Sequence, residues 1–373
     1  MEKAAVQEDG LLIPVDSIHS SSLNSSSLNG LMLTFESQLI DFSKFLNGSP
    51  AQKLETAKAI LTGFQTAGFI YLSNIPIPAS AVQHVFDTSA EFFRLPRTTK
   101  DSLAWSSPEA NRGYSAPGRE KVTQLTTTAA VSALRDSIPD IKESFEIGRD
   151  NEPAHPNNWP PEKEEPDAAG TRLAGFRPTM TSFFADLAAL HGSVMRAIAV
   201  GMGLPDETFF DRFVSDGDNT LRLLHYPAVN KDVFRANPGQ VRAGEHSDYG
   251  SITFLFQDGA GGLQVQSPGG RFVDATPIEG TCVVNAGDLL ARWSNDTIRS
   301  TVHRVVEPPR TRTERGDGEE EEYPARYSIA YFCNPNFKDF IDAIPGTYAT
   351  EADKKYPGIN SGEYLVQRLR ATY

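Results

Sequence analysis

Three side chains in the second half of the chain could together hold one metal ion. His246 and Asp248 stand two residues apart in the run EHSD. Side chains two apart on a β-strand point to the same face, so both could reach the same ion. His303 follows after 54 intervening residues, in the strand-like run STVHRVV, which leaves room for several strands to return it to that place. Two histidines and one carboxylate leave other coordination positions open, as oxygen-activating iron(II) requires.

Each of these residues alone is a weak signal, because a His-x-Asp pair is common by chance and a strand histidine is usually a satisfied core residue. A further pair strengthens the combination. Arg326 and Ser328 also stand two apart, in the run ARYSIAYFC, and therefore share a strand face. A planar guanidinium beside a hydroxyl suits one carboxylate ligand, although an arginine here could also serve an internal ion pair.

The elements that must position these residues are short β-like runs. From residue 220 onward they recur at regular intervals, separated by Gly, Pro, Asn and Asp: LRLLHYP, GSITFLFQ, GGLQVQS, RFVDATP, TCVVNAG, TVHRVVE and ARYSIAYFC. Seven or eight strands of this spacing predict a sandwich or a barrel. No glycine-rich loop joins a strand to a helix, so a dinucleotide-binding fold is not indicated.

The first half of the chain predicts helices. Ser49 and Gln52 form a capping-box pattern with proline at the first helical position, and apolar residues at 54, 57, 61 and 64 continue a helix that Gly68 ends. The run FIYLSNI, 69–75, predicts a strand, and 79–95 predicts another helix. Residues 105–170 are predicted to be rich in loops.

A long amphipathic helix is predicted after these loops. Its apolar residues recur at spacings of three and four, at 183, 187, 190, 194 and 198, so it should pack on something large. Residues 1–30 contain the low-complexity run SSSLNSSSLNG, which buries too little apolar surface to offset its ordering entropy and predicts a disordered tail.

Composition excludes several classes of function. A net charge of −13 makes nucleic acid an improbable partner, and no run approaches the roughly 18 apolar residues of a membrane span. The two cysteines, Cys282 and Cys333, stand in apolar runs and are expected to be buried thiols. The N-terminus lacks the pattern of a signal peptide, so a cytoplasmic location is the default expectation.

The ordered motifs His246-x-Asp248, His303 and Arg326-x-Ser328 resemble those of the 2-oxoglutarate/iron(II)-dependent dioxygenases. The resemblance is to the branch containing isopenicillin N synthase and the plant flavonoid and gibberellin oxygenases, and it covers roughly residues 35–350. The runs LIDFSKFL, GFIYLSN, DIKESFEIG and GSITFLFQDGAGGLQV are also similar to that branch. The resemblance implies a mainly β fold with flanking helices (α+β), built on a distorted double-stranded β-helix, a cupin-like jelly roll.

The resemblance also implies a division of the chain and a set of ligands. The tail at 1–30 would precede an N-terminal helical and mixed region at 31–170, the double-stranded β-helix domain at 171–345 and a C-terminal helical segment at 346–373. Fe(II), 2-oxoglutarate and O2 are the implied cofactors. Arg326, Ser328 and Tyr226 would hold the 2-oxoglutarate carboxylate.

Two features depart from the pattern of the plant relatives. Leu224 stands where many of them carry asparagine, so one hydrogen bond to the co-substrate is missing or is replaced from elsewhere. The acidic run TRTERGDGEEEEYP lengthens the connection between His303 and Arg326. We expect residues 310–324 to form either a solvated insertion without a role or a lid that helps to exclude water during turnover.

The predicted function is oxidation of a small organic molecule, as hydroxylation, desaturation or cyclisation, with release of succinate and CO2. Three alternatives stay open: an oxidase of the same fold that does not use 2-oxoglutarate, a non-catalytic binding protein on this scaffold, and a zinc hydrolase, for which the arginine–serine pair has no role. Oligomeric state and substrate are not predicted. Six residues near the motifs are candidates for the substrate pocket: Tyr114, Arg242, Tyr249, Arg292, Trp293 and Phe332.

Overall fold

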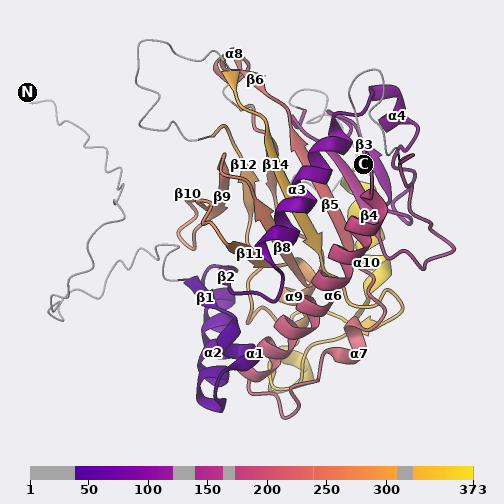
Figure 1. Cartoon of the computed structure of the whole chain (residues 1–373). Coiled ribbons are helices and arrows are strands. Elements are labelled where there is room, and N and C mark those ends of the chain that lie inside the picture. The colour runs from indigo at the N-terminus through magenta and orange to yellow at the C-terminus, as the bar shows by residue number, and fades with distance from the viewer. Residues whose placement is uncertain (1–37, 121–138, 163–172, 238, 309–321, 373) are drawn as a thin grey trace, which may run out of the picture. The chain divides into compact units, whose positions relative to one another are not determined.

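Two facing β-sheets form the centre of the computed structural model, which describes residues 38–120, 139–162, 173–237, 239–308 and 322–372. The larger sheet has the strand order β1-β2-β11-β8-β14-β5-β4-β3, and the smaller has the order β10-β9-β12-β7. All pairs within them are antiparallel except β1 with β2. The structure is therefore a mixed arrangement of sheets with helices against them (Figure 1).

The strands of the larger sheet are β1 (Leu39–Asp41), β2 (Phe69–Ser73), β3 (Gly113–Ser115), β4 (Glu143–Gly148), β5 (Thr220–Tyr226), β8 (Ile252–Gln257), β11 (Thr281–Ala286) and β14 (Arg326–Phe332). The smaller sheet consists of β7 (Ala243–His246), β9 (Leu263–Gln266), β10 (Phe272–Asp274) and β12 (His303–Val305). Two short pairs lie outside these sheets: β6 (Val229–Asn230) with β13 (Glu322–Tyr323), and β15 (Phe340–Ile341) with β16 (Ile359–Asn360). All seven strand-like runs predicted after residue 220 are strands.

The helices are α1 (Ser43–Asn47), α2 (Pro50–Thr66), α3 (Ala79–Phe93), α4 (Arg97–Asp101), α6 (Phe176–Gly201), α7 (Asp211–Val214), α8 (Lys231–Ala236), α9 (Asp288–Trp293) and α10 (Ser361–Thr372). A 3-10 turn, η3, spans Glu351–Asp353. Helices α3 and α6 lie side by side across the outer face of the larger sheet, and α2 packs against α6 (Figure 1).

Helix α2 begins with the predicted capping box. The Ser49 hydroxyl accepts from the Gln52 amide, and the Gln52 side chain accepts from the Ser49 amide. Gly68 adopts φ 73° just after the helix, a left-handed conformation that suits glycine. The predicted apolar face was partly wrong, because Leu54 is 42% exposed while Ala57, Ile60 and Phe64 are buried.

The stretch predicted to be rich in loops contains two strands of the larger sheet. Strand β4 pairs along its whole length with β5, and β3 pairs with β4. Polar residues at Glu143, Ser144 and Glu146 hide this strand from a hydrophobicity pattern, because they are buried as partners of other polar groups and not as apolar core. Periodicity alone therefore missed it.

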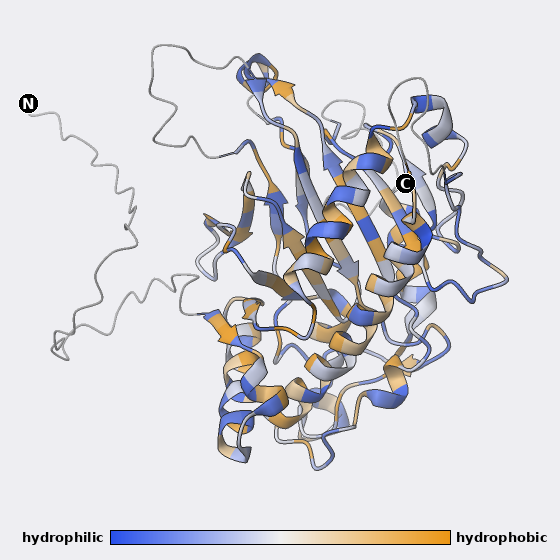
Figure 2. Cartoon of the chain, in the orientation of Figure 1, coloured by the Kyte–Doolittle hydropathy of each residue, from blue (hydrophilic) through white to orange (hydrophobic). Residues whose placement is uncertain are grey.

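Strand alternation divides the core into two parts. On β5, Leu221 and Leu223 point outward into the main core with α6, whereas Leu224 and Tyr226 point inward to the smaller cluster between the sheets. Figure 2 shows hydrophobic and hydrophilic residues mixed along the strands of the larger sheet and the helices that cover it. The inward face is therefore the one that can form a site between the two sheets.

Helix α6 contains the apolar face predicted at 183–198, and all five predicted positions are buried. Within the described ranges it is the one helix long and apolar enough to cross a membrane by length and composition. Its apolar side chains pack in the main core with the larger sheet and with α2 and α3, which accounts for that composition.

The predicted tail at 1–30 lies outside the described residues, as does most of the acidic loop at 310–324. Both cysteines are buried free thiols, as expected.

Candidate metal centre and adjoining cavities

The three predicted metal-binding side chains meet at one point between the sheets. His246 ends β7 and His303 begins β12, and the two residues are direct partners in the smaller sheet. Asp248 follows in the turn after β7. His303 Nε2 lies 3.7 Å and His246 Nε2 lies 3.9 Å from Asp248 Oδ1. Among the described residues this is the one group of three or more side chains placed to hold a metal ion.

Hydrogen bonds leave one ligand atom of each residue directed at the shared point. The Nδ1 atoms of His246 and His303 lie 2.8 and 3.2 Å from the carbonyl oxygens of Gly244 and Thr301. A carbonyl only accepts, so each Nδ1 carries the proton and each Nε2 keeps its lone pair. This arrangement fits a divalent metal.

Asp248 is oriented by two neighbours. Its Oδ2 accepts from the Thr253 hydroxyl at 2.6 Å and from the Asn285 amide at 2.7 Å, which leaves Oδ1 for an ion. Burial opposes ionisation of this carboxyl, but His303, His246 and the two hydrogen bonds outweigh burial and lower its pKa. Burial, with His303 nearby, lowers the pKa of His246 to about 3. The centre thus favours a neutral His246 beside an ionised Asp248, the forms that bind metal.

Two cavities adjoin this centre. The first, the sheet cavity, has a volume of about 70 Å³ and is lined by inward-facing residues of both sheets, including Tyr226, Arg326 and Ser328. The second, the helix cavity, has a volume of about 50 Å³ and is lined by Ser247, Tyr249 and residues of α10. His246, Asp248, Arg222 and Phe332 line both cavities, so the metal centre lies at their junction.

The sheet cavity ends at a buried arginine. Arg326 is 1% exposed and donates to the carbonyl of Gly261 at 2.9 Å, the hydroxyl of Ser328 at 3.1 Å and the amide oxygen of Gln257 at 3.2 Å. Its guanidinium lies 4.9 Å from the centre of the Tyr226 ring. All three hydrogen-bond partners are neutral, so this buried cation is suited to an anion in the cavity.

Leu224 lines the sheet cavity opposite Ser328, its partner in the strand register. The position therefore offers no hydrogen bond to a ligand, as the departure from the plant pattern suggested. Lys142, immediately before β4, lines the same cavity and brings a polar group that the sequence did not predict.

The helix cavity is closed by α10, which docks on the turn that contains Asp248. Arg368 donates to the Asp288 carboxylate at 2.5 Å, and the Ser247 hydroxyl donates to the same oxygen at 3.1 Å. The Tyr249 hydroxyl lies 2.6 Å from that of Thr372. The C-terminal helix is thus tied to residues on both sides of the metal-binding carboxylate.

A close approach of two backbones positions Asp288 for this contact. Its amide donates to the carbonyl of Asp248 at 2.7 Å. A Cβ at Gly287 would lie 2.4 Å from the carbonyl oxygen of Gly250, so only glycine lets the start of α9 pack against the metal-binding turn.

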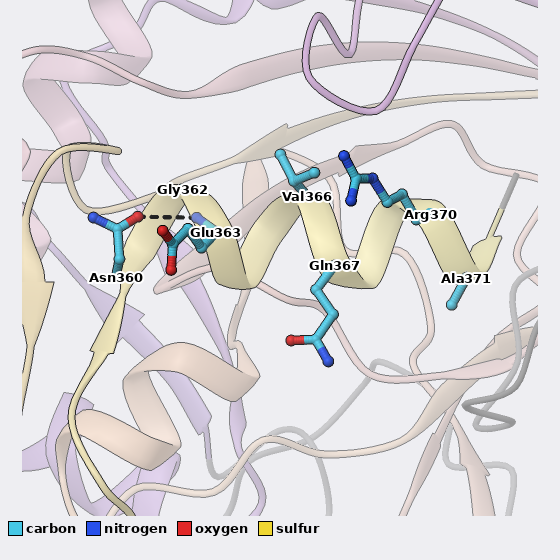
Figure 3. A pocket seen from close by; sticks show the side chains of 7 residues that line it. All are labelled: Asn360, Gly362, Glu363, Val366, Gln367, Arg370 and Ala371. Carbon is cyan, nitrogen blue, oxygen red and sulfur yellow. Dashed lines mark hydrogen bonds between the residues drawn. The ribbon is translucent and has the colours of Figure 1, made fainter.

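A groove of about 540 Å³ lies along α10, and Figure 3 shows the residues that line it. It is lined by Asn360, Val366, Gln367 and Arg370 among others, whereas Leu365 and Leu369 line the helix cavity. The groove contains one carboxylate, Glu363, and no histidine. Its side chains offer no comparable metal site.

Two of the six candidate pocket residues, Tyr249 and Phe332, line the helix cavity. The other four do not line either cavity. Tyr114 donates to Glu143 on the far side of the larger sheet, and Trp293 packs between Phe210 and Phe213.

Arg242 and Arg292 are also directed elsewhere. Arg242 is fully buried and donates to the carbonyl of Pro324, and Arg292 donates to the carbonyl of Pro357. Arg242 precedes β7 and Arg292 lies on α9, so neither stands on the inward face of a strand.

Sequence reasoning missed several cavity residues: Asn111, Glu120, Asn334, Leu365, Leu369 and Thr372. They come from loops and from α10, which carry no local motif. Arg222 could have been found, because it alternates with Leu224 and Tyr226 on one strand face.

Two histidines and a carboxylate with open positions, next to a cavity that ends at a buried arginine and serine, define a non-haem iron oxygenase site. Residues 217–335 match the 2OG-Fe(II) oxygenase superfamily. Residues 38–162 match the non-haem dioxygenase in morphine synthesis N-terminal family. The chain belongs to the 2-oxoglutarate/iron(II)-dependent oxygenase superfamily, as the sequence motifs predicted.

Curated relatives from fungi carry names of the same class. The 2-oxoglutarate-Fe(II) type oxidoreductase ppzD of Metarhizium rileyi is 33% identical, with 90% of each chain covered. The proline hydroxylase buaE of Petromyces alliaceus is 33% identical over 91% of this chain and 100% of its own. The chain is a 2-oxoglutarate-dependent dioxygenase, and the oxidase and binding-protein alternatives are not favoured.

Solved structures show a much higher similarity. A full-length protein of Neurospora crassa, in complex with alpha-KG and thymine, is 66% identical, with a TM-score of 0.80 over 90% of this chain and 96% of its own. The same protein was solved with alpha-KG and 5-formyluracil, at 63% identity and a TM-score of 0.79 over 90% of this chain and 96% of that one. Alpha-KG is 2-oxoglutarate, so this relative binds the predicted co-substrate.

Proposed function

We propose that this dioxygenase oxidises the methyl group of a free pyrimidine base such as thymine. The observation that carries the proposal is the 66% identity, over nearly the whole chain, to a protein solved with 2-oxoglutarate and thymine. The 5-formyluracil bound by the same protein differs from thymine in the oxidation state of the methyl carbon. The curated fungal relatives, at 33% identity, leave an amino acid or a secondary metabolite as a weaker second candidate.

In this proposal His246 Nε2, Asp248 Oδ1 and His303 Nε2 hold iron(II) at the junction of the two cavities. When bound, the iron supplies the oxidising chemistry with O2 and 2-oxoglutarate, and succinate and CO2 are released. The chain's own contribution is to fix the ligand atoms through Gly244, Thr301, Thr253 and Asn285.

The sheet cavity is proposed to take 2-oxoglutarate. Its far carboxylate would be held by Arg326 and Ser328, with Tyr226 beside them, and its keto acid end would point toward the metal. Three hydrogen bonds to neutral partners fix the guanidinium plane before the anion arrives. A preorganised buried cation of this kind gives a charge-assisted contact with little reorganisation.

The helix cavity is proposed to take the base. Phe332 and Tyr249 provide aromatic surface for a flat ring, and Leu365 and Leu369 of α10 exclude water from the opposite side. A base in this cavity lies beside the metal-binding face of His246 and Asp248. The proposed core of the fold, a double-stranded β-helix, is supported by the two facing antiparallel sheets around this site.

The test is succinate release by the iron-loaded protein with thymine, with uracil as the matched control that lacks the methyl group. Thymine should give one succinate for a hydroxymethyl product and two for a formyl product, and mass spectrometry distinguishes the products. Uracil should give little product because no methyl carbon is present. An absence of thymine-dependent succinate would refute the proposal, and proline in the same assay examines the second candidate.

A further inference from the structure

Four charged side chains are buried next to the metal centre, on the inward face of β4 and β5 and in the chain before β4. Arg222 Nη1 lies 3.0 Å from Glu120 Oε1, and Arg222 Nε lies 2.8 Å from Glu146 Oε1. Lys142 forms an ion pair with the second oxygen of Glu120. Each of the four side chains is 9% exposed or less. Two cations and two carboxylates thus neutralise one another out of contact with bulk water.

The two carboxylates of this cluster differ in what they face. Glu120 lines the helix cavity together with Arg222, whereas Glu146 lines neither cavity. Apart from the metal-binding Asp248, Glu120 is the one carboxylate among the described residues that line the helix cavity. It is therefore placed to contact whatever fills that space.

The neutral polar side chains of the cavity are already committed to protein partners. The Asn111 amide donates to Thr220 at 3.2 Å and accepts from the Trp105 indole at 3.1 Å. The Asn334 amide donates to the carbonyl of Asp218 at 2.9 Å. These hydrogen bonds leave the two neutral side chains with fewer donors and acceptors for a ligand.

Glu120 keeps acceptor capacity. An ionised carboxylate offers about four acceptor positions, and Lys142 and Arg222 take one on each oxygen. Burial opposes ionisation, but Arg222 and Lys142 outweigh it and lower the pKa of Glu120 to about 2. At neutral pH this side chain can only accept a hydrogen bond.

We propose that Glu120 is a specificity-determining residue that accepts a hydrogen bond from a ring N–H of the base, while Arg222 donates to the adjacent carbonyl. The two groups lie side by side, so they present an acceptor next to a donor. A pyrimidine base offers the complementary pattern along any edge where C=O adjoins N–H. The inference rests on the proposed function and adds which protein groups recognise the pyrimidine ring by hydrogen bonds.

The test compares thymine with 1-methylthymine and 3-methylthymine, in the wild type and in Glu120→Gln. One of the two N-methyl compounds should lose kcat/KM by more than about a hundredfold in the wild type, because a site built to pair with an N–H strongly rejects an analogue that lacks it. Glu120→Gln should lower kcat/KM for thymine by about ten- to a hundredfold. It should lower the value for that N-methyl compound far less, because the contact is already absent.

Equal losses for thymine and for both N-methyl compounds on substitution would overturn the inference, and so would a wild type that accepts both compounds. Glu146→Gln is the matched control, since Glu146 pairs with the same arginine but faces neither cavity. This variant should keep the wild-type ratio between the three substrates.

If Glu120→Gln fails to fold because Lys142 and Arg222 lose their charge partner, Glu120→Asp replaces it. The shorter side chain keeps the charge but retreats from the cavity, so discrimination should fall while the melting temperature is largely kept; wild-type discrimination would count against the inference. No turnover of thymine by the wild type would refute the proposed function as well, whereas normal turnover with equal losses would refute this inference alone.

Discussion

The sheet cavity and the helix cavity share the metal centre but are built from different kinds of structure. The polar residues at the far end of the sheet cavity stand on paired strands: Arg326 is the register partner of Tyr226, and Ser328 is the partner of Leu224. The helix cavity shares the strand residues Arg222, His246 and Phe332 with the sheet cavity, but is otherwise lined mostly by the chain before β4, the turn after β7 and the C-terminal helix α10. One cavity is fixed by backbone hydrogen bonds, and the other by side-chain contacts between segments far apart in sequence.

This difference matches two requirements of the chemistry. The 2-oxoglutarate-dependent dioxygenases share one co-substrate, so its site can belong to the rigid sheet framework. The substrate differs, and loops or terminal helices change without disturbing the sheets. Substitutions should therefore separate into those that affect the metal, those that affect 2-oxoglutarate and those that affect only the substrate.

The largest effect is expected at the junction of the two cavities. Asp248→Ala should abolish turnover and most iron binding, and His246→Ala and His303→Ala should do the same, because each removes one of three ligands. The protein should stay folded, since the main core does not include the centre. Anaerobic iron titration and circular dichroism measure the two properties, and wild-type rates in any variant would exclude that ligand.

A substitution at a residue that contacts a metal ligand, but is not one itself, serves as a graded control. Asn285→Ala removes a hydrogen bond to Asp248 Oδ2 but leaves all three ligands. We expect about a 10- to 100-fold loss of iron affinity, the range typical of partners that orient a ligand.

The next largest effect is expected at the end of the sheet cavity. Arg326→Leu should raise the 2-oxoglutarate concentration needed for half-maximal rate by a factor equivalent to about 2–5 kcal/mol, because it removes one partner of a buried charged pair. Ser328→Ala should cost about 1–3 kcal/mol. Titration with 2-oxoglutarate at saturating iron measures both, and unchanged affinity in Arg326→Leu would contradict the assignment of this cavity.

Tyr327→Phe is the control within the same strand. Tyr327 stacks on His225 at 4.7 Å on the outward face, between the two inward residues. The variant should leave 2-oxoglutarate affinity unchanged, because alternate residues of a strand face opposite sides.

The sequence predicted the sheet cavity better than the helix cavity for the same structural reason. His246 and Asp248, like Arg326 and Ser328, belong to local patterns with a spacing of two, which strand geometry converts directly into a shared face. Glu120 and Thr372 reach the helix cavity only through tertiary packing, and nothing in their neighbouring residues indicates it. Sequence motifs therefore predicted the co-substrate, whereas the proposed substrate rests on the relatives.

A smaller effect, limited to the helix cavity, is expected from the contact that holds α10. Arg368→Leu removes the ion pair with Asp288, and Asp288 keeps its hydrogen bonds from Ser247 and Ser300. A pair that is partly exposed is worth about 1–2 kcal/mol, so the thymine KM should rise about five- to thirtyfold. The affinity for 2-oxoglutarate in the absence of thymine should not change.

The ratio of succinate to oxidised product provides a second measurement for Arg368→Leu. With α10 loosened, water reaches the helix cavity, so more succinate should form per oxidised product. Arg370→Leu is the matched control on the same helix, because its ion pair with Glu109 is at the surface. Equal behaviour of the two arginine variants would mean that the Arg368 contact does not close the cavity.

The smallest effect is expected at Glu146, which is buried behind Arg222. Arg222 lines both cavities, whereas Glu146 lines neither. Burial raises the pKa of Glu146, with Arg222 opposing the shift. The folded state therefore disfavours the ionised form, and stability falls as pH rises from the unfolded pKa of about 4.3 through the raised folded pKa.

Glu146→Gln keeps an oxygen toward Arg222 without the charge. It should match the wild type in melting temperature near pH 4 and exceed it at neutral pH. Thermal melts between pH 4 and 8 measure this, and a variant that is less stable at neutral pH would show that the ion pair with Arg222 outweighs the cost of burial.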